Sequence, residues 1–117
     1  SAAIQDYEKK MTDAMLYGVD NLKGLNDFDK IEIIGGATNP SREGLVSFRF
    51  KDQPSEVIVR YLNQQGIRTH TRKCDHYSNN ILAPLGWDDC VRVSICHYNT
   101  VNEVKKFLSS MATFEDK

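Results

Sequence analysis

Apolar residues along this 117-residue chain alternate between two periods, that of a helix and that of a strand. Each change of period marks an element boundary, because a helix repeats its buried face about every 3.6 residues and a strand every two. The pattern predicts helices over about residues 3–24, 54–65 and 100–111, and strands over about 30–34, 44–50, 67–72 and 90–96. This order, α-β-β-α-β-β-α, predicts an α+β fold with helices packed on one face of a mostly antiparallel sheet of about four strands.

Start and stop signals agree with these boundaries. Gly24 and Gly66 follow the first two helical segments, where glycine commonly terminates a helix. Pro54 suits the first turn of the second helix, because a proline there loses no intrahelical hydrogen bond. Thr100 and Glu103 have the spacing of a capping box, in which each side chain accepts a hydrogen bond from the backbone of the other. The third helix therefore has the most clearly marked beginning.

Composition fits a single globular domain, with 40% hydrophobic and 26% charged residues. We expect one small domain over residues 1–117, with a connecting helix over about 1–25 and a sheet-and-helix sandwich over about 30–113. The net charge of -1 leaves no basic footprint for nucleic acid or an acidic membrane. No apolar run approaches the ~20 residues of a membrane span, and the polar start lacks the apolar centre of a signal peptide. We therefore expect a cytoplasmic protein whose three cysteines are reduced thiols.

A metal site or a catalytic triad needs an arrangement that the spacing does not supply. The potential zinc ligands are Cys74, His76, Cys90, Cys96 and His97. Their spacings match no paired-ligand pattern, and the neighbours Cys96 and His97 point to opposite faces of a strand. Asp75, His76 and Ser78 share one loop, which does not specify a nucleophile held by a base and an orienting acid. We expect no metal and no serine-type triad.

Arg92 lies in the middle of the otherwise apolar strand CVRVSIC. Alternation places Val91, Val93 and Ile95 on the core face, so Arg92 faces water, a partner domain or a ligand. A guanidinium is always charged, and its rigid fork matches a carboxylate. From spacing alone two interpretations stay open. One is a solvent-facing arginine with its stem along the sheet, which is the commoner case, and the other is an anion-binding arginine.

Cys74 is the second residue with two interpretations. It lies among Arg72, Lys73 and His76, and nearby cations favour the reactive thiolate form. The commoner alternative is an incidental loop cysteine without a chemical role.

Three segments together resemble the C-terminal small domain of class V aminotransferases: GLVSFRF, PSEVIVRYLNQQGIRTHTRKC and APLGWDDCVRVSICHYNTVNEVKKFLSSM. The resemblance runs from about Ile31 to Met111, and the first helix resembles the segment that joins the family's large domain to its small one. Its most specific part is VRVSICHYNT followed by Glu103-Val104, and the next is the helix-Gly-Ile-strand unit from Leu62 to Arg68. Members are fold-type I pyridoxal 5'-phosphate enzymes, including cysteine desulfurases and selenocysteine lyases.

The resemblance implies roles for both residues. Arg92 matches the family's arginine that holds the α-carboxylate of a small amino-acid substrate. Cys74 stands where cysteine desulfurases carry a mobile loop whose cysteine accepts sulfur and becomes a persulfide. The segment TRKCDHY is about one residue out of step with that loop and lacks its Gly-His-His-like motif. An aminotransferase, an epimerase or another lyase therefore stays open beside a desulfurase.

The resemblance also implies what this chain lacks. The family's Schiff-base lysine and the aspartate facing the pyridinium nitrogen lie upstream, in the large domain, and no lysine here has a Ser/Thr-x-His-Lys-like context. We therefore expect about the last quarter of such an enzyme, inactive alone and with no cofactor-binding residue of its own. The large domain of the same chain would bind pyridoxal 5'-phosphate, and the complete enzyme would form a homodimer. The alternative is a free-standing α+β binding or interaction module without catalysis.

Overall fold

The computed structural model describes residues 1–34, 44–74 and 88–117, and everything below concerns these residues. The helices are α1 (Ala2–Tyr17), α2 (Ser55–Gln64) and α3 (Val101–Glu115). The strands are β1 (Gly18–Val19), β2 (Leu22–Lys23), β3 (Ile31–Ile33), β4 (Leu45–Phe50), β5 (His70–Lys73) and β6 (Asp89–Ser94). Two short 3-10 turns, η1 (Leu25–Asp27) and η3 (Ile95–His97), complete the described elements.

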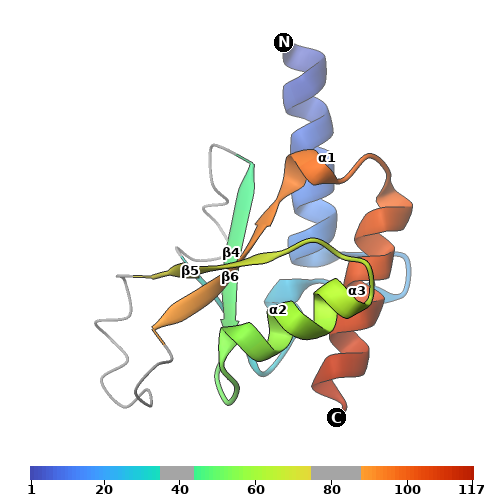
Figure 1. Cartoon of the computed structure of the whole chain (residues 1–117). Helices are drawn as coiled ribbons and strands as arrows, with labels where there is room; N and C mark the ends of the chain where they lie inside the picture. The colour runs from blue at the N-terminus through green and yellow to red at the C-terminus, as the bar shows by residue number, and fades with distance from the viewer. Residues whose placement is uncertain (35–43, 75–87) are drawn as a thin grey trace.

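The main sheet has four antiparallel strands in the order β3-β4-β6-β5. β4 and β6 are therefore the central pair, and β5 lies at an edge. α1 and α3 lie side by side, and α2 lies close to β5 and β6 (Figure 1). The predicted α+β class and the predicted order of helices and sheet strands are confirmed, with the small β1–β2 hairpin as an addition.

One face of the central strands forms the core, as the alternation predicted. The buried residues on this face of β4 and β6 are Val46, Phe48, Phe50, Val91 and Val93. The ring of Phe48 meets Phe107 of α3 edge to face at 6.1 Å between centroids. Phe50 meets Phe114 of α3 in the same way at 5.1 Å. All three helices contribute to this one cluster, so the opposite face of the sheet, hereafter the open face, carries the remaining strand residues.

The first helix ends at Tyr17, so the predicted end near residue 24 is wrong. Gly18 follows with φ of 103°, a conformation that favours glycine, and begins the hairpin. Gly24 is a close-approach residue rather than the helix stop, because a β-carbon there would lie 2.4 Å from the carbonyl oxygen of Leu16. Leu22 and Leu25 continue the helical spacing into the hairpin and η1, which explains the overextended prediction.

The ends of the other elements follow their local signals. Gly66, with φ of 79°, ends the α2 segment, and the amide of Ile67 donates to the carbonyl of Leu62 at 2.9 Å. β5 therefore begins only at His70, three residues later than predicted from the start at residue 67. Thr100 accepts a hydrogen bond from the Glu103 amide at 3.4 Å, which confirms the cap of α3.

Candidate functional site

The open face gathers positive charge beside the middle of β6. Strand register places Ser47 of β4 on one side of Arg92 and His70 of β5 on the other. Arg72 follows His70 by two residues and therefore lies on the same face of β5. Arg92 is thus held between two neighbouring strands, whereas Arg72 lies on the edge strand and is exposed.

A pocket of about 380 Å³ opens on this face. Its lining residues are Leu45, Arg68, His70, Arg72, Arg92, Ser94 and His97. Three of these described lining residues carry guanidinium groups, two carry imidazoles and none carries a carboxylate, so this part of the lining concentrates positive potential. An anion with fork-matching oxygens, such as a carboxylate, is the ligand that this lining suits best. Arg68, His70 and Arg72 stand at alternate positions of the chain, and all three line this pocket.

Arg49 is paired with a carboxylate of the sheet, and Arg92 differs from it in this respect. Nε of Arg49 lies 3.0 Å from Oε1 of Glu32 on β3, and its side chain is 4% exposed. Arg92 is half-buried, and its Nε has no hydrogen-bond partner among the described residues. In the part of the chain that the structure describes, no ion pair joins Arg92 to a carboxylate. No described carboxylate therefore neutralises the charge of Arg92.

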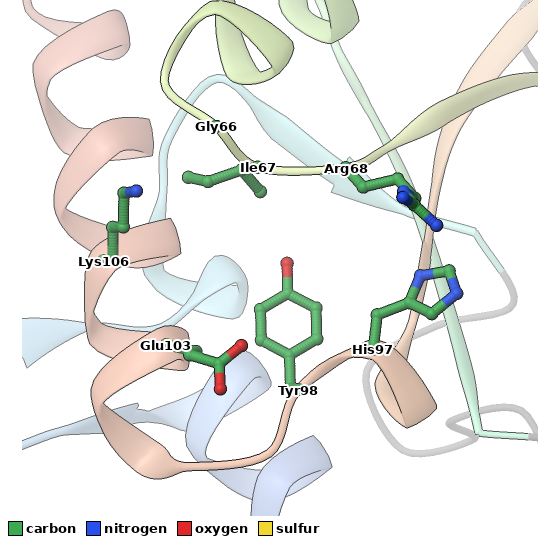
Figure 2. Close-up of a pocket in the computed structure, with 7 residues that line it drawn as sticks. All are labelled: Gly66, Ile67, Arg68, His97, Tyr98, Glu103 and Lys106. Atoms are coloured by element: carbon green, nitrogen blue, oxygen red, sulfur yellow. The ribbon is translucent and has the colours of Figure 1, made fainter.

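A second pocket, of about 300 Å³, lies beside the first and is drawn in Figure 2. Its lining residues are Gly66, Ile67, Arg68, His97, Tyr98, Glu103 and Lys106. Arg68 and His97 line both pockets, so the two are adjacent. The hydroxyl of Tyr98 points toward Ile67 (Figure 2), and it is buried without a hydrogen-bond partner among the described residues. Burial, and to a smaller extent the charge of Glu103, raises the pKa of Tyr98, so the phenol stays protonated.

Cys74 forms a disulfide with Cys90, which corrects the expectation of reduced thiols. The two cysteines are 16 residues apart in sequence. Because Arg72 pairs with Cys90 across the strands, the Cα atoms of Cys74 and Cys90 lie 5.9 Å apart. Cys90 is fully buried, Cys74 is 8% exposed, and Cys96 is a free, exposed cysteine. Alternation along β6 puts Cys90 on the face of Arg92, two residues away. The disulfide therefore borders the cationic pocket.

The sequence also raised the questions of a metal site, a serine-type triad and a membrane span. No group of three potential metal ligands occurs within residues 1–34, 44–74 and 88–117. Asp75, His76 and Ser78 lie outside the described residues. None of the described helices has the length and apolar character needed to cross a membrane.

Comparison with known proteins decides the family. The family profile described as aminotransferase class-V matches residues 1–107. The chain belongs to the class V aminotransferase family. The resemblance seen in the sequence is thereby confirmed.

One similar class V protein is a "Probable cysteine desulfurase" of Borreliella burgdorferi (strain ATCC 35210 / DSM 4680 / CIP 102532 / B31). The two are 31% identical over 105 residues, which is 90% of this chain and 23% of that relative. The chain therefore spans about a quarter of the length of the curated relative that it matches.

Proposed function

We propose that this chain is the small domain of a pyridoxal-phosphate-dependent class V enzyme, in which Arg92 holds the α-carboxylate of a small amino-acid substrate. Family membership supports the class of enzyme, and the name of the Borreliella relative favours chemistry on cysteine. The observation that supports the role of Arg92 is its half-buried guanidinium on a central strand, whose Nε has no partner within residues 1–34, 44–74 and 88–117. The proposal includes a cytoplasmic homodimer, in which the large domain of the same chain covers the open face.

Arg92 suits this role better than the other arginines of the pocket. Arg68 and Arg72 are exposed and lie before or within the edge strand β5, so their side chains have more freedom. Arg92 is fixed by strand pairing on both sides, which limits the entropy lost when its fork meets a carboxylate. The same carboxylate would then be surrounded by the positive charge of the outer arginines.

The residues of this pocket fit the substrate rather than the cofactor. Pyridoxal phosphate needs a lysine for its Schiff base, and it supplies the electron sink for reactions at the α-carbon when bound. No lysine is among the described residues that line the open-face pocket, and Lys106 lines the neighbouring one. The cofactor would therefore be held by residues outside this set, and we propose that the isolated chain is inactive.

Cys74 is the proposed sulfur acceptor if the enzyme is a desulfurase. It lies at the end of β5 next to the cationic face, where a substrate anchored by its carboxylate would be close. Only the reduced thiol could accept sulfur, because the disulfide with Cys90 occupies its Sγ atom. An aminotransferase would keep the role of Arg92 without any role for Cys74.

Arg92→Lys in the complete enzyme tests the carboxylate role. Lysine keeps the charge but loses one of two charge-assisted hydrogen bonds, worth about 1.5–3 kcal/mol. We expect kcat/KM for the amino-acid substrate to fall roughly 10- to 100-fold while the cofactor's absorbance stays unchanged. Arg60→Lys, on the exposed part of α2, is the matched control. Unchanged kcat/KM in Arg92→Lys would refute the role, and loss of cofactor absorbance would assign Arg92 to the cofactor instead.

A further inference from the structure

The disulfide joins Cys74, the candidate sulfur acceptor, to Cys90, whose side chain is not part of the hydrophobic core. Cys90 faces away from Val91 and Val93, which fill the core side of β6. It is nevertheless fully buried, against its partner sulfur. Two cysteines on neighbouring antiparallel strands can form and break this bond without a change of strand register, because their Cα atoms are already 5.9 Å apart.

We propose that Cys90 is a resolving thiol that releases sulfur from Cys74 as hydrosulfide. This inference rests on the proposed function, in which Cys74 carries the sulfur as a persulfide. The Cys90 thiolate attacks Sγ of Cys74, a sulfur–sulfur bond forms between the two residues, and the bond to the outer sulfur breaks. The outer sulfur leaves with the electron pair as HS⁻ and is thereby reduced, while the two cysteine sulfurs become oxidised to the disulfide. A reducing dithiol then returns both cysteines to thiols and itself becomes a disulfide.

The surroundings of Cys90 favour this reaction over attack by an external thiol. Arg72 stands directly opposite Cys90 across the β5–β6 pair, and Arg92 is two residues away on the same face. Cations near a cysteine favour its thiolate form, which is the attacking species. The neighbouring Lys73 is instead engaged by Asp88 and Asp89, at 3.3 and 3.2 Å. Because Cys90 is buried, the sulfur in its reach is that of Cys74.

A single-turnover experiment on the complete enzyme tests this step. The enzyme is reduced with a dithiol, desalted, and mixed with one equivalent of L-cysteine without added thiol. We expect wild type to release about one equivalent of hydrosulfide and to gain the Cys74–Cys90 disulfide, detected by peptide mass. Cys90→Ser should keep one extra sulfur atom on Cys74 and release at least tenfold less hydrosulfide. Cys96→Ser, which removes the exposed free thiol, should behave as wild type.

The outcomes separate this inference from the function on which it rests. Equal hydrosulfide release by Cys90→Ser and wild type would overturn the resolving role while leaving the persulfide on Cys74 intact. If Cys74→Ser still converts cysteine to alanine and sulfide at the wild-type rate, Cys74 is no acceptor and both ideas fall. Cys90→Ala serves as a second variant, with circular dichroism as the folding check, and must retain the persulfide as Cys90→Ser does.

Discussion

Replacing Tyr98 by phenylalanine should stabilise the chain. Tyr98 is 5% exposed, and its hydroxyl is buried without a hydrogen-bond partner among the described residues. Its ring meets Phe107 edge to face at 6.3 Å, and its carbonyl accepts a hydrogen bond from the Tyr7 hydroxyl. Phenylalanine keeps the ring contact and the backbone acceptor, so the substitution removes the oxygen alone.

The size of the effect follows from two opposing contributions. A buried hydroxyl without a partner costs about 1–3 kcal/mol, which the variant recovers. Loss of one oxygen leaves a void of about 15 Å³, which costs about 0.4 kcal/mol at roughly 24 cal/mol per Å³. The expected net change is a gain of about 1 kcal/mol in the free energy of unfolding, or roughly 4 °C in Tm.

Urea unfolding at neutral pH measures this difference, with Tyr61→Phe as the control. The ring of Tyr61 also packs on an aromatic neighbour, Phe114, but its hydroxyl is not among the buried atoms without a partner. The control should stay within about 0.5 kcal/mol of wild type. A Tyr98→Phe variant less stable than wild type by more than about 0.5 kcal/mol would show that the hydroxyl has a partner and would refute the reasoning.

The pH dependence of the same variant gives a second test. Burial raises the pKa of Tyr98 above its ordinary value of 10.0, so the unfolded chain releases the phenolic proton first as the pH rises. Wild type should therefore lose free energy of unfolding as the pH rises above about 10, and Tyr98→Phe should lack that part of the slope. Parallel slopes for the two proteins between pH 9 and about 11 would contradict this assignment.

Two further predictions concern the local structure around the site. Thr100→Ala removes the cap of α3 and should cost about 1 kcal/mol in urea unfolding, whereas Ser109→Ala on the exposed side of the same helix should change the free energy by less than about 0.5 kcal/mol. Reduction with dithiothreitol should lower the free energy of unfolding by about 3 kcal/mol, because the disulfide closes a loop between residues 16 apart. The free energy of unfolding of the Cys74→Ser/Cys90→Ser double variant should not change with the reductant. If the reductant lowered it as much as it lowers that of wild type, the disulfide would not be the cause.

The sequence predicted those parts of the fold that rest on a long apolar period. The buried residues of β4, β6 and α3 repeat often enough to show whether each element is a strand or a helix and which of its faces is buried. Thr100 marks where α3 begins. The β1–β2 hairpin was missed because strands of two residues have no period to detect. Leu22 continued the helical spacing by coincidence, and only the conformation at Gly18 separates the two elements.

The candidate site was predictable one residue at a time but not as an arrangement. Alternation placed Arg92 on the face away from the core and left its role open, and the family resemblance implied the role in binding a carboxylate. The register that places His70 beside Arg92, and Cys90 opposite Arg72, depends on pairing between strands separated by residues 74–88, which a linear pattern does not encode. The cysteine pair follows from that register, which the spacing of the cysteines in the sequence does not reveal.

Arg49 and Arg92 show how the same sheet treats a structural and a candidate functional guanidinium. Across the strands, Arg49 faces Glu32, and the carboxylate neutralises its buried charge. Arg92 faces Ser47 on one side and His70 on the other, and neither residue carries a compensating negative charge. A partly buried charge without a partner destabilises a fold, so a purely structural position would favour a carboxylate neighbour or an apolar residue. No carboxylate of the described residues pairs with Arg92, and this is the physical basis for our proposal that a ligand carboxylate supplies the negative charge.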